Sequence, residues 1–524
     1  MKAKASGRSF ISDSQMTRVA VATTSQLAAD AAAEVADAGG NAVDSAIAAA
    51  LLTMNTEPGV CALAGSAFIT IWPADGDAVT IDGNVAIPGY GNPAFDAGFG
   101  SQTVNLEYGG GVETLVGAAS VAVPGSLASL EMASRDYGRL SWRNLVEPSI
   151  RATKQGFPLS AACYHYLQYS GEPIFSRSAD GYQALHDSDG TLRPAGSRII
   201  VPHLAESLDL IAREGSRVFH EGEIGRRIAD HLQENGGLLT ADDMQRYEPI
   251  VRTSLQVDMS DWSIATNPPP AIGGSMLCAM LLGFRNTKFT CWDKSALLHL
   301  VNVQHAALRY RTDILDVSND VVKDIEAMLS LAHSGELSSG TVSGSTVHTS
   351  AVDDHGLACA ITASSGYGSG EMPEGTGLWL NNCMGEIELN RDGLDAGPIG
   401  SRLPSNMAPT VARKRDTVLA VGSPGADRIT TALQQFLINF VQMGMPLAAA
   451  IDQSRMHLEV RGPETVLAIE PGLDLPDISM KVKQFTEKGM YFGGVGVALH
   501  DPVHGFDVAA DPRREGGTYT SNAR

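Results

Sequence analysis

The sequence predicts a large mixed fold of the α/β (α+β) class, and three observations support this prediction. The chain has 524 residues, of which 44% are hydrophobic and 19% are charged, a composition typical of globular proteins with an extensive core. Stretches with a helical pattern, many of them rich in alanine, alternate with short runs rich in β-branched residues. Aromatic residues make up only 6% of the chain, so we expect the backbones to pack closely through small side chains.

The first expected elements are two alanine-rich helices within residues 24–54, separated by Gly39-Gly40-Asn41. The second of these helices is apolar on nearly every side, which predicts that it is buried. A β-hairpin follows, with strands at residues 67–72 and 78–81 joined by the turn Asp75-Gly76-Asp77.

The pattern from Ser120 to about Gly236 is mainly helical. Thr240 and Asp243 then form a capping box, with a threonine N-cap and an acid three residues later, which predicts the start of a short helix. After a proline-rich loop, another helix is expected to begin near Ser275, and helices are expected to continue to about residue 333.

Residues 334–345, with the sequence SGELSSGTVSGS, form the most serine- and glycine-rich junction of the chain. Such a composition cannot bury enough surface to order itself strongly, so the segment is interpreted as a flexible linker. An ordinary surface loop is the simpler alternative.

The pattern changes to strands immediately after this linker. Strands are expected at residues 346–352 and 357–363, and residues 353–356 form a good hairpin turn between them. A further pair of strands is expected at residues 417–422 and 495–500.

Charge and cysteine usage exclude several classes of function. The formal net charge is −21 and no dense run of Lys or Arg occurs, which argues against nucleic acid as a partner. The six cysteines are scattered, with no CxxC pair and no metal-ligand spacing, so no metal and no organic cofactor is expected.

No targeting signal is expected from the sequence patterns either. The first sixteen residues lack the apolar core of a secretory signal. The most apolar stretch, residues 46–54, is too short to span a bilayer. The expectation is therefore a cytoplasmic protein with no membrane partner.

Common catalytic motifs do not occur: there is no HExxH, GxSxG, Walker lysine motif or GxGxxG before a helix. What remains is the junction of the flexible linker with Thr346. If the bond between Ser345 and Thr346 were cut, Thr346 would carry a hydroxyl nucleophile beside a free α-amine. That amine has a pKa of about 7.7–8.0, against about 10.4 for lysine, so it is a suitable general base near neutral pH.

A series of short blocks, correct in order and spacing, resembles the γ-glutamyltranspeptidase family of N-terminal-nucleophile hydrolases along nearly the whole chain. The blocks are residues 39–44, 120–125, 239–244, 268–274, 346–350 with Asp353 and Gly356, 367–370, 380–382, 422–425 with Arg428 and Ile429, and 511–513.

The resemblance implies a four-layer αββα sandwich, made as a precursor and cut into two intertwined subunits. On this chain the subunits would be residues 1–345, ending in the linker 334–345, and residues 346–524, starting at the nucleophile. The expected partners are a small-molecule amide substrate and the chain's own cleaved subunit, and an assembly of such heterodimers is compatible with this reading.

The resemblance also implies a set of catalytic residues. Thr346 matches the family's nucleophile, and Ser364 falls where the family has a second hydroxyl near it. Gly425 and Ala426 match the backbone amides of the oxyanion hole, where alanine is acceptable because only its N–H is needed.

The expected substrate-binding residues depart from the family's pattern at three positions. Asn84 stands in the segment where the family has an arginine that holds the substrate α-carboxylate. Gly366 replaces a family asparagine, and Cys383 replaces a family glutamine. Losing a charged, often bidentate partner of a carboxylate is a substantial change.

The remaining substrate-binding positions are closer to the family. Glu386 stands where the family has an aspartate for the substrate amine, and Ser405 and Asn406 match the family's paired serines. Arg402 and Arg428 are candidates for a replacement cation, although such arginines are more often structural.

Three functions follow from these residues. The leading hypothesis is an autoprocessing threonine amidohydrolase or transferase that cleaves γ-glutamyl amides such as glutathione. The second has the same mechanism but a non-glutamyl substrate, such as an oxamate-like or acyl β-lactam-like amide, and Asn84 favours it. The third is an inactive family member with a binding role. Residues 386–404 are short for a lid, so we expect an open cleft that favours hydrolysis over transfer.

Overall fold

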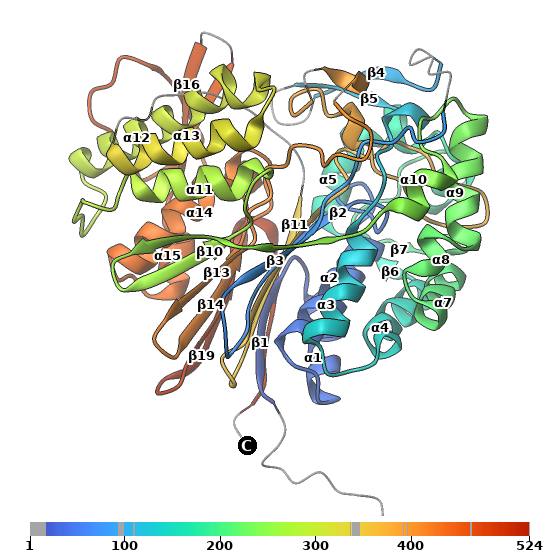
Figure 1. The fold of residues 1–524 in the computed structure, drawn as a ribbon, viewed down its shortest axis with the longest axis horizontal. Helices are drawn as coiled ribbons and strands as arrows, with labels where there is room; N and C mark the ends of the chain where they lie inside the picture. Colours follow the sequence, from blue (N-terminus) through green and yellow to red (C-terminus); the bar gives the residue numbers. More distant parts are fainter. Residues whose placement is uncertain are drawn as a thin grey trace, which may run out of the picture.

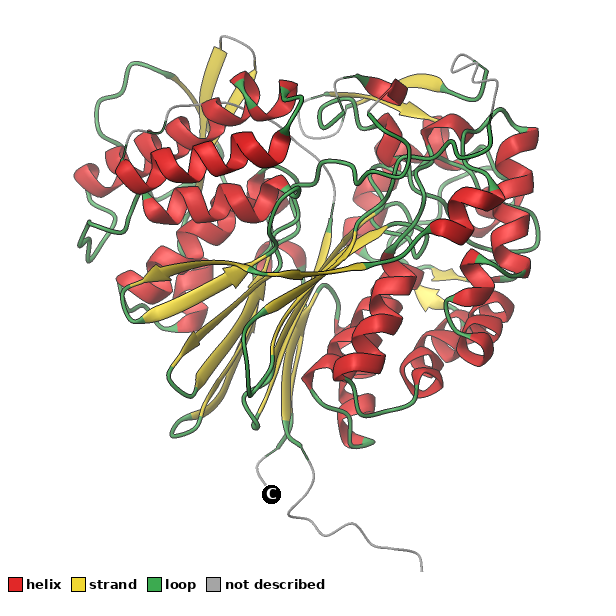
Figure 2. Cartoon of the chain, viewed as in Figure 1, coloured by secondary structure: helices red, strands yellow, loops and turns green. Residues whose placement is uncertain are grey.

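The fold consists of two stacked antiparallel sheets enclosed between two layers of helices (Figure 1, Figure 2). It is seen in a computed structural model that describes residues 17–92, 99–107, 111–335, 337, 346–390, 392–395, 397–461 and 464–522. The predicted αββα arrangement is therefore confirmed. Most of the linker 334–345 lies outside the described residues, as does the proposed cleavage point.

The first sheet has seven strands and contains both predicted hairpins. In spatial order its strands are β20 (Gly517–Thr520), β1 (Val19–Thr23), β11 (Val347–Asp353), β12 (Ala358–Ser364), β2 (Ser66–Trp72), β3 (Val79–Gly83) and β8 (Ile250–Thr253).

The second sheet has six strands, and the predicted pair at residues 417–422 and 495–500 lies side by side within it. In spatial order its strands are β19 (Gly505–Ala510), β18 (Gly496–Asp501), β14 (Thr417–Gly422), β13 (Thr410–Lys414), β10 (Trp262–Thr266) and β9 (Leu255–Met259).

Two groups of helices cover the outer faces of the sheets (Figure 1). The group on the side of the first sheet comprises α1 (Gln26–Asp37), α2 (Ala42–Thr56), α3 (Ser126–Tyr137), α4 (Trp142–Gln155), α5 (Ala161–Ser170), α6 (Ala179–Leu185), α7 (Leu204–Glu214), α8 (Arg217–His220), α9 (Glu223–Glu234) and α10 (Ala241–Arg246). The group on the second sheet comprises α11 (Ile272–Leu282), α12 (Lys294–Asp313), α13 (Val321–Ser334), α14 (Arg428–Leu437) and α15 (Leu447–Asp452).

Smaller sheets lie outside the sandwich. They are β15 (Met456–Arg461) with β16 (Glu464–Ile469) and β17 (Lys481–Gln484), β4 (Gln102–Leu106) with β5 (Val112–Val116), and β6 (Phe157–Pro158) with β7 (Arg198–Ile199). Within the described residues, no helix has both the length and the apolar character that a membrane span requires.

Small side chains line the space between the two sheets, as the low aromatic content predicts. Alanines from both sheets, including Ala20, Ala360 and Ala420, form most of this inner core. Close approach is visible at Gly422, where an added Cβ would lie 2.1 Å from Cε1 of His348 on the facing strand. The two sheets therefore approach more closely than larger side chains would allow.

His348 belongs to this interface rather than to the catalytic chemistry. Its Nδ1 lies 2.8 Å from the Thr362 hydroxyl and its Nε2 lies 2.7 Å from the Ser350 hydroxyl, so both ring nitrogens are satisfied. Burial lowers the pKa of His348 to about 3, because a charged imidazolium is poorly solvated between the sheets. The ring is thus neutral at ordinary pH.

One predicted boundary is wrong by a few residues: α11 begins at Ile272 rather than near Ser275. The backbone N–H groups of Ile272 and Gly273 both donate to the Ser405 carbonyl at 3.0 Å. Because this carbonyl satisfies the first donors of the helix, the two glycines that precede Ser275 are included in its first turn.

Candidate active site

Thr346 immediately precedes β11, at the centre of the seven-stranded sheet, and is only 4% exposed. The strand register pairs Val347 with Ala363, so Ser364 at the end of β12 lies beside Thr346 at the same edge of the sheet. The Ser66 hydroxyl on the neighbouring β2 donates to the Ser364 carbonyl at 3.0 Å. Strand pairing therefore fixes both predicted hydroxyl residues.

The predicted oxyanion residues form a tight turn between β14 and α14. Gly425 has φ +126° and Ala426 has φ +71°, and the latter is an uncommon conformation for a residue other than glycine. Among the described residues, no acceptor hydrogen-bonds to the backbone N–H of either one. A strained turn with two unused donors suits an anion-binding role.

Eight of the ten predicted site residues line one small cavity, of about 20 Å³. They are Thr346, Ser364, Ala426, Asn84, Cys383, Glu386, Ser405 and Asn406. The other two, Gly366 and Gly425, lie beside it, next to Glu386 and Ala426 respectively. The cavity has roughly the room of one water molecule.

Five further residues complete the lining, and the sequence analysis assigned a role to none of them. They are Ser66, Val85, Leu389, Pro404 and Met407. Only the pairing of Ser66 with Ser364 in adjacent strands would have identified one of them, and that pairing joins segments almost 300 residues apart.

Asn84 uses its side chain for a structural hydrogen bond. Its Nδ2 donates to the Leu403 carbonyl at 2.7 Å, and its backbone carbonyl accepts from the Tyr247 hydroxyl at 2.6 Å. The residue is 2% exposed. Asn84 thus ties the end of β3 to the segment that carries Ser405, at the place where the family resemblance would put an arginine.

Neither of the two candidate arginines reaches the nucleophile cavity. Arg402 lies over the ring of Tyr247, 4.3 Å from its centroid, and faces the buried carboxylate of Asp82. Arg428 binds Asp427 at 2.6 Å and donates to the Tyr491 carbonyl. Consequently no Lys, Arg or His occurs among the described residues that line this cavity.

Gly366 lies against the carboxyl of Glu386. The sequence presents these two residues as separate departures from the family. Gly366 has φ +65°, and a Cβ added to it would lie 2.3 Å from Oδ1 of Asn382 and 3.0 Å from Oε2 of Glu386. The Glu386 carboxyl therefore packs against the space that any side chain at residue 366 would need. We therefore expect the longer acid and the missing side chain at residue 366 to compensate for one another.

Two buried asparagines hold this part of the wall. Asn381 accepts from the backbone N–H groups of Ala122 and Cys383 and donates to the carbonyls of Ala64 and Ala122. Asn382 accepts from the Tyr367 N–H at 2.7 Å. Their side chains replace the hydrogen bonds that a regular strand would supply, so the loop is positioned without being part of a sheet.

Burial dominates the electrostatics of the cavity. It raises the pKa of the Glu386 carboxyl well above its ordinary value, with the negative charge of Glu388 as a second cause. It also raises the pKa of the Cys383 thiol, which hydrogen-bonds to Glu386. The thiol is therefore a poor nucleophile at neutral pH.

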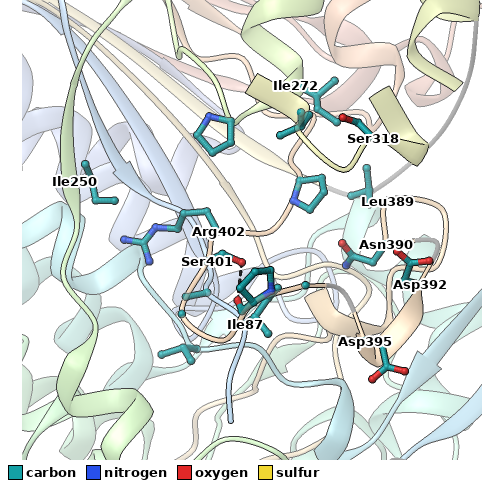
Figure 3. A pocket seen from close by; sticks show the side chains of 18 of the residues that line it. Ile87, Ile250, Ile272, Ser318, Leu389, Asn390, Asp392, Asp395, Ser401 and Arg402 are labelled. Carbon is teal, nitrogen blue, oxygen red and sulfur yellow. Dashed lines mark hydrogen bonds between the residues drawn. The ribbon is translucent and has the colours of Figure 1, made fainter. Parts of the chain in front are cut away.

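A wider cleft of about 1060 Å³ adjoins the cavity and shares Leu389 and Pro404 with it. Figure 3 shows Arg402 on one side of this cleft and Asp392 and Asp395 on the other. Residues 389–404 contribute to this cleft, but Thr346 lines only the small cavity beside it. In the part of the chain that the structure describes, no three His, Cys, Asp or Glu side chains are grouped to hold a metal ion.

Comparison with solved structures identifies the class of fold. A cephalosporin acylase from Bacillus halodurans superposes with a TM-score of 0.77 at 22% identity, covering 100% of this chain and 99% of that one. The gamma-glutamyltranspeptidase of Helicobacter pylori gives 0.50 at 20% identity, covering 65% of this chain and 95% of that one. At such identities the likeness concerns the fold alone, a four-layer αββα sandwich.

Sequence comparison then identifies the family. The model of the gamma-glutamyltranspeptidase family matches residues 28–521, so the chain belongs to this family and is an enzyme. A glutathione hydrolase proenzyme of Pseudomonas aeruginosa is 28% identical over 538 residues, covering 95% of this chain and 93% of the relative. The proenzyme of the same name from Escherichia coli is 26% identical over 475 residues, covering 83% and 80%.

Proposed function

We propose that this enzyme cuts its own chain between Ser345 and Thr346 and then uses Thr346 to hydrolyse γ-glutamyl amides such as glutathione. The observation that carries the proposal is the convergence of Thr346, Ser364 and Ala426 on one cavity. The names of the two relatives support a precursor that matures and acts on glutathione.

The same atoms serve both reactions. In maturation, Oγ of Thr346 attacks the carbonyl carbon of Ser345 and the peptide C–N bond breaks, which frees the α-amine and leaves an ester. Water then hydrolyses this ester, which releases the Ser345 carboxylate and restores the Thr346 hydroxyl. In turnover, that amine accepts the hydroxyl proton as Oγ attacks the substrate amide. The proton then passes to the leaving nitrogen, and water hydrolyses the acyl-enzyme.

The turn at Gly425 and Ala426 stabilises the negative charge that develops on the carbonyl oxygen. Removing a single oxyanion donor from an enzyme typically costs about 2.7–4 kcal/mol of transition-state stabilisation. Two unused N–H groups on a rigid turn can supply this stabilisation without reorganising during the reaction. The carboxyl of Glu386, on the opposite wall, faces the amine of the acyl group.

A second candidate is a non-glutamyl acyl group, and one observation favours it. The side chain of Asn84 is committed to the Leu403 carbonyl, and the described lining holds no cation for an α-carboxylate. An acyl group without that carboxylate would lose nothing in such a cavity. A screen of anilides with γ-glutamyl and with small uncharged acyl groups decides between the two candidates.

Maturation is tested by mass spectrometry of the purified protein. We expect two chains, the smaller one beginning at Thr346, because the free α-amine that serves as the base exists only after cleavage. Only intact chains of 524 residues after long incubation would contradict the proposal. An intact chain with turnover would show instead that another group provides the base.

A further inference from the structure

A second carboxyl lies behind the acyl-binding wall, two residues after Glu386. The side chain of Glu388 does not line the nucleophile cavity. It turns instead toward Tyr367, whose hydroxyl donates to Oε1 of Glu388 at 2.6 Å. The other oxygen, Oε2, is buried, and among the described residues it has no hydrogen-bond partner.

The turn at Gly366 and Tyr367 lies between the two carboxyls. On one side, the position of a Cβ on Gly366 is 3.0 Å from Oε2 of Glu386. On the other side, Tyr367 is 1% exposed and holds Glu388 through its hydroxyl. The Tyr166 hydroxyl fixes the same turn by donating to the Tyr367 carbonyl at 3.0 Å. The spacing of the two acids is thus set by a rigid, buried turn.

The charged and titratable groups around this pair do not neutralise it. Arg311 is the cation that acts on Glu388, but its Nε binds Asp316 at 3.1 Å. The negative charge of Asp427 acts on Glu388 in the opposite sense, and Asp427 itself is bound by Arg428 and His457.

Glu386 is buried, and Glu388 is half-buried with its Oε2 enclosed. With so little compensation, the two carboxyls cannot both be ionised easily. Burial raises the pKa of Glu388 to about 7, in spite of the Tyr367 hydrogen bond and Arg311. Burial and the charge of Glu388 raise the pKa of Glu386 well above its ordinary value. Because the Tyr367 hydroxyl donates to Glu388 and stabilises its charge, the proton that the pair retains near neutral pH resides on Glu386.

We propose that Glu388 is a positioning residue that acts through Glu386, keeping it protonated in the empty cavity so that it ionises when an acyl group with an ammonium group binds. On binding, the Glu386 proton leaves for solvent and the carboxylate pairs with the ammonium. This inference rests on the proposed function, in which the cavity holds the acyl group. The inference deepens the proposed function, because it makes the recognition of cationic acyl groups depend on pH.

The sign of the pH dependence follows directly. Below the pKa of Glu386, binding of the ammonium must expel a proton from Glu386, so kcat/KM for cationic acyl donors falls as the pH is lowered. Uncharged acyl donors need no such ionisation and lack this acid limb. Removing the charge of Glu388 lowers the pKa of Glu386, so the limb moves to lower pH.

The test is Glu388→Gln, assayed from pH 5 to 9 with γ-glutamyl-p-nitroanilide and an uncharged acyl p-nitroanilide. Glutamine preserves the size of the side chain and an acceptor for Tyr367. We expect the acid midpoint for the glutamyl substrate to fall by about one pH unit, which is about tenfold in kcat/KM on the acid limb, mainly through KM. The uncharged substrate shows no displacement.

Two further variants are assayed together with Glu388→Gln. Glu374→Gln, at an exposed position, is the matched control and leaves both profiles unchanged. Tyr367→Phe retains the ring but removes the donor to Glu388, which raises the pKa of Glu388, neutralises it, and moves the limb in the same direction as Glu388→Gln. This variant also answers the question if Glu388→Gln does not fold.

The outcomes separate the two proposals. An acid limb that stays in place in both variants overturns the inference, as does an equal loss at every pH for both substrates, which would mark Glu388 as merely structural. If wild type hydrolyses only the uncharged anilide, the glutamyl assignment and this inference both fail, while the threonine mechanism stands. If it hydrolyses neither, the proposed function itself is wrong.

Discussion

The two sides of the nucleophile cavity are built by different means. Thr346 and Ser364 lie at the ends of paired central strands, where the backbone ladder fixes them. The opposite wall, from Cys383 to Glu386 and around Ser405, consists of loops positioned by side-chain amides. The first side carries residues for which the resemblance predicts catalytic roles, and the second carries residues for which it predicts substrate binding. Under the proposed function, catalysis therefore depends on the ends of paired strands, and acyl recognition depends on loops.

Removing the nucleophile tests the sheet side and has the largest expected effect. Thr346→Ala should abolish chain cleavage and reduce turnover by at least about a thousandfold, because no other hydroxyl occupies the same position. Thr346→Ser should retain part of both activities, since it preserves the hydroxyl but loses the methyl that restricts its rotamer. Gel electrophoresis and anilide hydrolysis report the two activities separately.

Normal maturation of the alanine variant would contradict this assignment, because the cut would then be made by another protease. The buried Ser350 on the same strand provides a matched control. Its hydroxyl lies 2.7 Å from Nε2 of His348 and donates to the Gly496 carbonyl. Ser350→Ala should therefore lower thermal stability and leave the cleavage position unchanged.

Local patterns predicted the parts of the fold whose partners are close in sequence. The hairpin of β11 and β12 and the capping box at Thr240 were both predicted and are both observed. No sequence pattern predicts a strand at residues 19–23 or 517–520, although β1 pairs with β20 through Val21 and Tyr519. Nothing near either segment indicates a partner almost 500 residues away, so neither the pairing nor the sheet edge could be predicted.

The site shows the same division. The grouping of Thr346, Ser364 and Ala426 followed from the family resemblance. Strand register places Thr346 beside Ser364, and Ala426, from the turn after β14, lines the same cavity. The contact between Gly366 and Glu386 and the hydrogen bond from Asn84 to Leu403 could not be predicted, because they join separate loops. Substitutions that compensate through space look independent in a sequence.

Restoring a family residue on the loop side should therefore fail when it is made alone. Gly366→Asn accepts the positive φ but places its Cβ against Asn382 and Glu386, and such overpacking typically costs about 1–3 kcal/mol. Adding Glu386→Asp should recover part of this loss, because the shorter acid withdraws from the contact. Thermal unfolding of both single variants and the double variant measures the coupling free energy between residues 366 and 386. This coupling is expected at about 0.5–3 kcal/mol.

If the changes in unfolding free energy of the two single variants simply add in the double variant, the two positions do not compensate for one another. Gly366→Ala is the matched control, because it introduces the same Cβ in the same backbone conformation without the amide. It should be at least as destabilised as Gly366→Asn, since alanine is less well adapted than asparagine to a positive φ.

Asn84→Arg restores a cation to the acyl wall and has the smallest expected effect. The arginine must give up the hydrogen bond to the Leu403 carbonyl, which costs about 1–3 kcal/mol where an acceptor is left buried. It gains a charged hydrogen bond to an α-carboxylate, with a contribution of about 1.5–3 kcal/mol. The absolute rate therefore changes little, but the preference for glutamyl over uncharged acyl groups should rise by about tenfold or more.

The ratio of kcat/KM for γ-glutamyl-p-nitroanilide to that for a simple acyl anilide isolates this preference, because any loss of stability affects both substrates alike. Asn84→Met is the control: it also breaks the Leu403 hydrogen bond and adds length, but supplies no charge, so its ratio should equal that of wild type. A wild type that already strongly prefers the glutamyl substrate, with no gain from Asn84→Arg, would contradict the reading of the wall as one that has lost carboxylate recognition. Since neither Arg402 nor Arg428 lines the cavity, such a preference would have to come from Glu386 and the loop amides alone, and Glu386→Gln would then abolish it.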